Sequence, residues 1–431
     1  MGPRWWREAQ IRSVAGRNGQ HSEDAPRVLI YSHDTYGLGH LRRSILVASG
    51  LVAGADPPLS VLIATGSPRA QAFELPDGCD TLKLPSVTKT PEGTYRPRTL
   101  NVPLDELVAV RSELLRSTAR SFRPDLLLVD HSPVGMQGEL WPLFRDMNNW
   151  SSRPTVVLGL RDITDAADAV RGEWDASGAW EALGGVYDRM LVYGDEHLPT
   201  TAQDLRLAER FPGKVKLVGY LARSIRPPTQ SQNGVPTVLV TAGGGGDGHQ
   251  LLSGYLSFLE RLPADSRFRS IVVTGPFLSR SRQREVKARC RALGPSVEVL
   301  CFTDHFEELL SSAAGVVSMA GYNTVVEILS AGVPALLVPR RKPRMEQWLR
   351  AQRLAALDGD FITLAQTPDP SVIGRFVERV ISGNSNGRPP AIRMDGLAAT
   401  VDELRGLVEN ARQRQERPIA AGGENRVAAL A

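Results

Sequence analysis

The chain has 431 residues, of which 42% are hydrophobic and 23% charged, with a formal net charge of +4. This length exceeds what one hydrophobic core usually supports, so we expect two domains of a globular protein. The positive excess is small and forms no dense basic tract with interleaved aromatics, which argues against a nucleic-acid partner. The three cysteines lack metal-ligand spacing, and no apolar run approaches the roughly 18 residues of a membrane span. The sequence predicts a cytoplasmic protein.

Residues 1–25 are polar, rich in arginine and without periodicity, so we expect a disordered leader. From 26 to 225, continuous apolar runs alternate with amphipathic segments such as 104–122. This alternation is typical of buried parallel strands and the helices that connect them. The expected strands of this half are 27–32, 60–65, 125–130, 155–160 and 189–194.

A stretch rich in Pro, Ser, Gln and Asn at 226–236 indicates a linker, after which the alternation restarts. The expected strands of the second half are 237–242, 270–275, 297–302, 315–320 and 334–339. We therefore predict an α/β protein with two Rossmann-like, doubly wound domains, 26–225 and 237–395, that face each other across a cleft. Residues 416–431 are expected to form a flexible tail.

Each half opens with a strand and a glycine-rich turn, first at Gly37 and Gly39 and then at Gly243, Gly244 and Gly245. Glycine lets a backbone approach a ligand closely, and the helix that follows favours an anion at its N-terminus. The second turn matches GxGxxG, but no acidic residue ends the next strand to hold a ribose, so a nicotinamide cofactor is disfavoured. The first turn predicts an acceptor or phosphate loop, to which Arg42 also belongs.

The stretch 318–348 carries the most specific pattern. A strand ends at Met319, and Gly321 permits a tight entry into a helix whose free N–H groups, from Gly321 through Asn323 to Thr324, are predicted to face a phosphate. Glu327, further along that helix, can accept two hydrogen bonds from the neighbouring hydroxyls of a ribose. A basic loop at 340–344 is followed by Glu346 and Gln347, whose side chains suit a polyhydroxylated ligand.

This stretch resembles the nucleotide-sugar signature of GT-B glycosyltransferases, in particular the peptidoglycan N-acetylglucosaminyltransferase (MurG) type and related predicted bacterial transferases. The resemblance covers roughly residues 27–365. It implies that Glu327 holds the donor ribose and that Glu346 and Gln347 hold sugar hydroxyls, although Glu346 replaces the glutamine of the family. It also implies a base-binding segment at Phe302 and Thr303.

The same resemblance implies two further features of the chain. The loop "TAGGGGDG", with its glycines at 243–245, corresponds to the loop that opens the donor domain of the family. A C-terminal helix at 396–415 is expected to return to the N-terminal domain, because GT-B proteins have such a helix.

Candidate catalytic residues follow two expected strands of the first half. His40 lies in the first glycine turn, and Asp130 ends the apolar run "DLLLVD" at the carboxyl edge of the predicted sheet. Histidine suits a base that takes the proton of an acceptor hydroxyl, and an aspartate behind it would fix its tautomer. His33, His131 and Asp34 remain alternatives. Of the two arginines after His40, we expect one to point outward and one to pair with an acidic or phosphate group.

Together these features predict an inverting glycosyltransferase of the hexosyltransferase class that uses a nucleotide-sugar donor, with a UDP-sugar favoured. No metal and no cofactor are expected, since no DxD pair follows a strand and arginines with helix N-termini can neutralise the leaving diphosphate. A nucleotide-sugar hydrolase or 2-epimerase of the same fold and a non-catalytic sugar-nucleotide-binding protein are the alternatives. The acceptor stays open between a lipid-linked compound and a small molecule, and so does peripheral contact with the inner face of a membrane.

Overall fold

The computed structural model describes residues 25–33, 39–90, 94–223, 234–263, 268–303, 305–384 and 387–416. Several sequence predictions lie outside these residues: nearly all of the leader, Gly37, Asp34, the linker up to residue 233, and the tail from residue 417. No helix in the described ranges is both long and apolar enough to cross a membrane.

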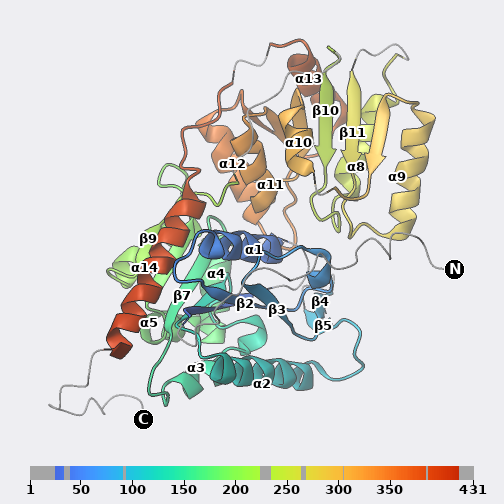
Figure 1. Ribbon diagram of the computed structural model, residues 1–431. Coiled ribbons are helices and arrows are strands. Elements are labelled where there is room, and N and C mark those ends of the chain that lie inside the picture. The colour runs from blue at the N-terminus through green and yellow to red at the C-terminus, as the bar shows by residue number, and fades with distance from the viewer. Residues whose placement is uncertain are drawn as a thin grey trace, which may run out of the picture.

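The N-terminal half contains a parallel sheet with the strand order β3-β2-β1-β6-β7-β8-β9 (Figure 1). Its strands are β1 (Arg27–Ser32), β2 (Ser60–Thr65), β3 (Cys79–Lys83), β6 (Leu126–Asp130), β7 (Thr155–Arg161), β8 (Arg189–Tyr193) and β9 (Val215–Leu217). A separate antiparallel pair consists of β4 (Val87–Lys89) and β5 (Tyr95–Pro97). The central strands read as continuous apolar runs because helices cover both faces of the sheet.

The C-terminal half contains a second parallel sheet, with the strand order β12-β11-β10-β13-β14-β15. Its strands are β10 (Thr237–Thr241), β11 (Arg269–Val273), β12 (Val297–Leu300), β13 (Gly315–Ser318), β14 (Ala335–Leu337) and β15 (Ile362–Leu364). The predicted α/β fold with two doubly wound sheets is confirmed. The sequence analysis missed the edge strands β3, β9 and β15, because half-exposed edge positions lack a continuous apolar run.

Helices connect the strands in both halves. The N-terminal half has α1 (Gly39–Val52), α2 (Leu104–Phe122), α3 (Trp141–Met147), α4 (Ala167–Ser177), α5 (Ala179–Gly185), α6 (Thr201–Asp204) and α7 (Leu207–Arg210). The C-terminal half has α8 (His249–Leu259), α9 (Arg280–Ala292), α10 (Phe306–Ser311), α11 (Tyr322–Ala331), α12 (Glu346–Leu357) and α13 (Pro370–Ile381), followed by α14 (Gly396–Glu416). Short 3-10 helices lie at η2 (Ala70–Ala72) and η3 (Met136–Gly138).

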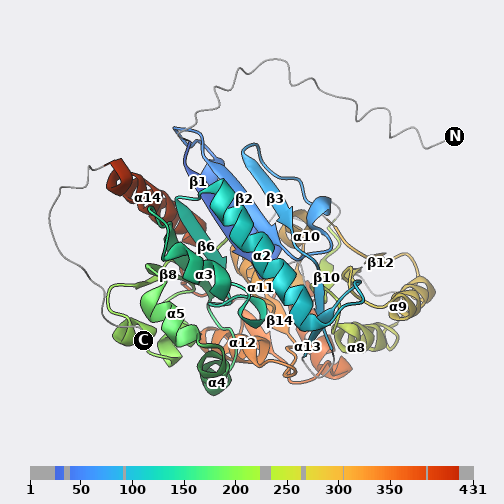
Figure 2. The same ribbon diagram turned by 90° about the horizontal axis from the view of Figure 1, so that it is seen from below.

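Two apolar clusters cover the two faces of the N-terminal sheet. Val28 and Ile30 of β1 face the cluster that contains residues of α1 and α14, whereas Leu29 and Tyr31 face the cluster with residues of α2 and α3. Figure 2 shows α2 and α3 crossing this sheet on the side viewed from below. The first cluster continues through buried Tyr322 into the C-terminal half. The two halves therefore share one apolar core at their junction.

Helix α14 follows the C-terminal sheet in the chain but lies along the N-terminal half (Figure 1). The guanidinium of Arg405 donates to the backbone oxygens of Gly50, Leu51 and Ala53, at the end of α1, over 2.7–3.1 Å. A cation at this position stabilises the last carbonyls of a helix. This contact joins α14 to α1, the helix that begins in the first glycine turn.

Candidate active site between the two domains

The site begins where two neighbouring strands end. Strands β1 and β6 pair in parallel, so their carboxyl ends lie at the same edge of the sheet. β6 ends at Asp130, and His33 follows β1 before α1 begins at Gly39. The first turn of α1 therefore brings His40 to the carboxylate of Asp130.

His40 and Asp130, predicted as a pair, are in direct contact. His40 Nδ1 lies 2.5 Å from Asp130 Oδ2. Arg43 binds the same carboxylate, with Nε 2.9 Å from Oδ1 and Nη2 2.7 Å from Oδ1. Arg43 Nη2 also lies 2.9 Å from His40 Nδ1, but the shorter contact is to an ionised carboxylate, which only accepts hydrogen bonds. This contact assigns the proton to Nδ1 and leaves Nε2 as the basic nitrogen. The arrangement orients an imidazole with a free acceptor nitrogen.

The surroundings keep this imidazole neutral. Burial lowers the pKa of His40 to about 4; the carboxylate of Asp130 opposes the shift, and the charges of Arg43 and Arg161 add to it. Burial alone would raise the pKa of Asp130, but Arg43 and His40 hold it below its usual range. The pair therefore carries one negative charge near neutral pH, which Arg43 compensates.

The two rival histidines lie beside His40. The ring centroids of His33 and His131 are 5.8 and 5.1 Å from that of His40, and 5.8 Å from each other. Burial holds the pKa of both rings well below the ordinary value. His131 has a left-handed backbone, with φ of 72°, and its buried Nδ1 has no hydrogen-bond partner among the described residues. Three neutral imidazoles thus form one cluster, and His40 is the member in direct contact with the carboxylate of Asp130.

Arg43 connects this cluster to the C-terminal domain. Its guanidinium lies 5.9 Å from the ring centroid of Tyr193 and 5.6 Å from that of Tyr322, the first residue of α11. The hydroxyl of Tyr322 donates to the backbone oxygen of Tyr193 at 3.2 Å. The expectation that one arginine of the turn points outward is wrong, because both pair with carboxylates. Arg42 Nη2 lies 3.4 Å from Glu327 Oε1.

The predicted ribose-binding residue, Glu327, faces this junction. It lies on α11 beside a cavity of about 30 Å³, to which Arg42 and Asn323 also contribute. Asn323 Nδ2 donates to the backbone oxygen of Gly39 at 3.2 Å, so the first turn of α1 contacts α11 directly. Burial raises the pKa of Glu327, and Arg42 opposes the shift. A cavity of this size holds one or two water molecules.

The second glycine turn lies beside the start of α11. A side chain at Gly243 would come within 3.8 Å of Thr324 Oγ1. Gly245 has φ of 87°, and a Cβ there would lie 2.3 Å from the backbone oxygen of Thr274. A Cβ at Gly244 would meet only ordinary contacts, the nearest at 3.4 Å. The turn therefore requires glycine at Gly245, whereas a Cβ fits at Gly244.

The predicted base-binding segment follows β12. Phe302 is 45% exposed, which is unusual for a large apolar side chain in this protein. Thr303 Oγ1 accepts a hydrogen bond from the backbone N–H of His305 at 3.0 Å. An exposed aromatic side chain at the carboxyl edge of a sheet is available to stack on a planar ligand.

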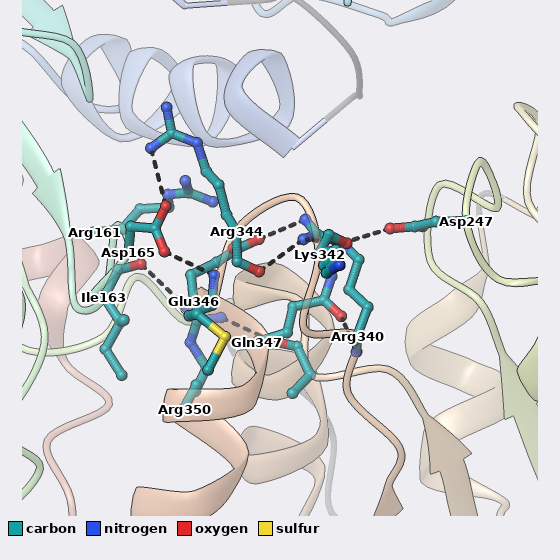
Figure 3. A network of polar contacts seen from close by, with 12 residues as sticks. Arg161, Ile163, Asp165, Asp247, Arg340, Lys342, Arg344, Glu346, Gln347 and Arg350 are labelled. Carbon is teal, nitrogen blue, oxygen red and sulfur yellow. Dashed lines mark hydrogen bonds and ion pairs between the residues drawn. The ribbon is translucent and has the colours of Figure 1, made fainter. Parts of the chain in front are cut away.

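The loop before α12 holds the predicted sugar-binding pair (Figure 3). Arg340 Nη2 donates to Glu346 Oε1 at 2.6 Å, and Arg340 Nε lies 2.5 Å from Asp247 Oδ2. The backbone N–H of Arg340 donates to Gln347 Oε1 at 3.4 Å. Glu346 is buried, and its Oε2 has no hydrogen-bond partner in the part of the chain that is described. One carboxylate oxygen of the pair is thus left without a donor.

The same loop reaches the N-terminal domain. Arg344 Nη2 lies 2.9 Å from Glu173 Oε2, and the backbone N–H of Met345 donates to Asp165 Oδ1 at 2.7 Å. Figure 3 shows Arg344 extending toward Asp165, away from Asp247 on the other side of the loop. The loop therefore contacts both domains.

The sequence analysis missed two charged residues that follow each other at the end of β7. Arg161 has no ion pair with a carboxylate among the described residues, and its buried Nε has no hydrogen-bond partner. Burial and the charges of Arg43 and Arg350 lower its pKa to about 10. Asp162 forms a fully buried ion pair with Arg350 of α12, at 2.7 Å. The signal that identified Asp130, a charge at the end of an apolar run, is also present here.

No group of three or more histidine, cysteine, aspartate or glutamate side chains in the described ranges is arranged to hold a metal ion.

Comparisons with known proteins show which family the C-terminal half resembles. Residues 237–389 match the glycosyltransferase family 28 C-terminal domain. Two curated relatives are named UDP-N-acetylglucosamine–N-acetylmuramyl-(pentapeptide) pyrophosphoryl-undecaprenol N-acetylglucosamine transferase. The protein from Oenococcus oeni is 30% identical over 105 residues, covering 24% of this chain and 28% of that protein. The protein from Mesorhizobium japonicum is 29% identical over 300 residues, covering 61% and 76%.

Solved structures show the same fold at low sequence identity. MurG of Acinetobacter baumannii has a TM-score of 0.53 at 13% identity, covering 90% of this chain and 99% of that one. A putative UDP-N-acetylglucosamine 2-epimerase from Listeria monocytogenes has a TM-score of 0.59 at 12% identity, covering 91% and 98%. These findings show that the chain has the GT-B fold, that its C-terminal half matches the family 28 domain, and that it resembles the MurG type.

Proposed function

We propose that this glycosyltransferase moves a sugar from a UDP-sugar to an acceptor hydroxyl, with inversion at the anomeric carbon and without a metal. The observation that carries the proposal is the 2.5 Å contact between His40 Nδ1 and Asp130 Oδ2, which leaves Nε2 as a base. The names of the curated relatives, which contain UDP-N-acetylglucosamine, support the choice of donor.

The reaction would begin with an acceptor hydroxyl hydrogen-bonded to His40 Nε2. Its oxygen attacks the anomeric carbon from the face opposite the diphosphate while the proton moves to Nε2. The bond between the anomeric carbon and the diphosphate oxygen breaks, and UDP leaves with the bonding electrons. The carboxylate of Asp130 stabilises the imidazolium that forms, and Arg43 keeps that carboxylate in position.

The donor would bind mainly to the C-terminal domain. The free N–H groups at the start of α11 suit the diphosphate, and Glu327 suits the ribose hydroxyls. Because Arg42 pairs with Glu327 at 3.4 Å, donor binding would replace this ion pair, freeing Arg42 for a phosphate. Arg161, which has no carboxylate partner among the described residues, adds a positive charge for the leaving diphosphate.

Substitution of His40 tests the proposal. His40→Ala should lower turnover of UDP-N-acetylglucosamine by about 100-fold or more, because general-base catalysis contributes about 10²–10⁴. UDP affinity, measured by calorimetry, should stay within about twofold. His249→Ala is the control, since His249 of α8 pairs with exposed Glu285 of α9. Turnover close to that of the unchanged protein would remove His40 from this role and turn attention to His33 and His131.

A hydrolase or 2-epimerase remains the second candidate, because the Listeria structure shares the fold. Product analysis separates these reactions. Free sugar or an epimerised nucleotide-sugar formed without acceptor would favour the alternative, whereas an acceptor-dependent glycoside would favour transfer. The names of the curated relatives describe a lipid-linked acceptor, so a lipid-linked acceptor at a membrane surface is one of the two acceptor classes to test.

A further inference from the structure

A large cavity lies in the N-terminal domain, next to the histidine cluster. Its volume is about 480 Å³, within the range of about 300–1,000 Å³ that is typical of small-molecule sites. His33 and His131 line it, as does Arg344 of the loop before α12. The cavity therefore adjoins the proposed base but is separate from the donor-binding helix α11.

Aromatic side chains form much of the wall. Trp174 of α4 is 5% exposed and packs edge-on against Trp180, with ring centroids 4.9 Å apart. Trp141 is held by a hydrogen bond from Nε1 to the backbone oxygen of Ser177 at 3.2 Å. Tyr95 contributes a third ring. Faces of this kind bind planar apolar groups by stacking and by burial of apolar area.

Residues 132–138 form a loop that lines the cavity, and buried side chains fix this loop by hydrogen bonds. Buried Glu139 pairs with Arg111, whose Nε lies 2.5 Å from Oε2, and accepts a hydrogen bond from the hydroxyl of Tyr31 at 2.6 Å. The same hydroxyl accepts from the backbone N–H of Met136 at 2.9 Å. Tyr187 donates to the backbone oxygen of Pro133 at 2.5 Å. The cavity is therefore preformed, which lowers the entropic cost of binding a ligand.

Two of the residues that line the cavity, Glu173 and Arg344, are charged and pair with each other, and the other polar side chains that line it are neutral. Thr164 is 4% exposed, and its hydroxyl has no hydrogen-bond partner in the described structure. Buried polar groups are normally hydrogen-bonded, so this hydroxyl is suited to a ligand. His33 and His131 supply neutral imidazoles at the same end as His40.

No free positive charge is available in the cavity. Arg344 is the one arginine or lysine among the described residues that line it, and its guanidinium already pairs with Glu173 at 2.9 Å. An anionic ligand would lose its hydration without gaining a counter-charge. The charge balance therefore disfavours a phosphorylated group in this cavity.

We propose that the cavity is the acceptor site and that it binds an uncharged aromatic compound whose hydroxyl points toward the histidine cluster. This inference rests on the proposed function, because it makes the bound hydroxyl the group that attacks the donor sugar. The proton of that hydroxyl goes to His40 Nε2, its oxygen bonds to the anomeric carbon, and UDP leaves. The acceptor class thus differs from the lipid-linked diphosphate in the names of the curated relatives.

Calorimetry with three probes tests the proposal: 2-naphthol, 2-naphthyl phosphate and UDP. Ala176 is exposed, lines the cavity and lies on α4, so Ala176→Trp should fill the cavity without disturbing the core. Arg171→Trp adds the same ring to an exposed position of α4 that does not line the cavity. We expect 2-naphthol to bind the unchanged protein and Arg171→Trp equally, and Ala176→Trp at least about tenfold more weakly.

2-Naphthyl phosphate tests the charge preference of the cavity, and UDP tests the proposed function independently of the cavity. 2-Naphthyl phosphate should bind the unchanged protein at least about tenfold more weakly than 2-naphthol, because the cavity offers no counter-charge. Tighter binding of the phosphate, or equal 2-naphthol affinity in both tryptophan variants, would overturn the proposal. UDP affinity should be the same in all three proteins. Loss of UDP binding in the unchanged protein would count against the proposed function and would leave the naphthol result as a separate test of the cavity.

Discussion

The two domains share a doubly wound parallel sheet but bury different kinds of polar groups. The N-terminal domain buries charged side chains at and near the carboxyl edge of its sheet, among them Arg43, Arg111, Asp130, Glu139 and Asp162. In the described C-terminal domain, the buried charges are Glu346 and Arg350, both on α12, and Arg350 pairs with the N-terminal Asp162. The rest of its candidate site consists of the second glycine turn, α11 with Glu327, the segment at Phe302 and Thr303, and the loop before α12.

This difference separates two kinds of chemistry. A buried charge is costly unless it is paired, and Arg43, Arg111, Asp130, Glu139 and Asp162 each have an oppositely charged partner. Fixed charges suit proton transfer, which needs a base in a defined tautomer. Glycine turns and helix N-termini bind phosphates with backbone groups and need no buried charge. The N-terminal domain is thus organised for catalysis and acceptor choice, and the C-terminal domain for the donor.

The largest effect is expected at the ion pair that joins the domains. Asp162→Asn should lower the free energy of unfolding by about 3–5 kcal/mol, because it leaves Arg350 buried without a counter-charge. Asp168→Asn is the control: Asp168 pairs with Arg171 on the surface of α4 and is 94% exposed, so its loss should cost less than about 0.5 kcal/mol. Urea denaturation measures the stability of both variants. Equal stability of the two would contradict the role of the buried Asp162–Arg350 pair.

The next effect concerns the donor side. Glu327→Ala should weaken UDP binding by about 1.5–3 kcal/mol, since the ribose loses a charge-assisted pair of hydrogen bonds. Glu308→Ala is the matched control, because Glu308 is 79% exposed on neighbouring α10. Calorimetric titration with UDP compares the variants. Unchanged UDP affinity in Glu327→Ala would show that this carboxylate serves the ion pair with Arg42 alone.

A smaller effect is expected in the second glycine turn. Gly245→Ala should cost about 1–2 kcal/mol of stability, because its φ of 87° is unfavourable for alanine and its Cβ would meet a backbone oxygen at 2.3 Å. Gly244→Ala is the neighbouring control, with its nearest contact at 3.4 Å. Thermal unfolding of the two variants compares them directly. If Gly244→Ala were the more damaging change, the turn would have another conformation.

The smallest effect is a pH dependence that originates in the N-terminal domain. Because the pKa of His40 falls to about 4 on folding, the unfolded chain binds more protons below pH 6.5, and stability declines as the pH falls from 6.5 toward 4. Between pH 7.5 and 5.5 this histidine should account for about 1 kcal/mol. Denaturation of the unchanged protein and of His40→Asn at both pH values measures the difference, and identical slopes would contradict the buried, neutral state of His40.

Much of the fold and part of the site follow from the sequence. Apolar runs such as 27–32 and 125–130 match β1 and β6 closely, because strands covered on both faces need continuous apolar residues. His40 and Asp130 could be predicted as neighbours, since each follows one of these runs and the carboxyl ends of parallel strands share an edge. The start of α11 after Gly321 could also be predicted, because a glycine just before a helix is a local sequence signal.

Only the tertiary structure decided which partners the charged groups have. Arg43 binds Asp130 across 87 residues of sequence and Arg350 binds Asp162 across 188, and no local pattern distinguishes these arginines from others. The cavity beside the histidines depends likewise on a loop held from behind by Glu139 and Arg111. Local patterns record burial and backbone conformation, which are properties of single segments. Pairing of buried charges and the shape of a cavity depend on how distant segments pack, so they emerge only when the chain is folded.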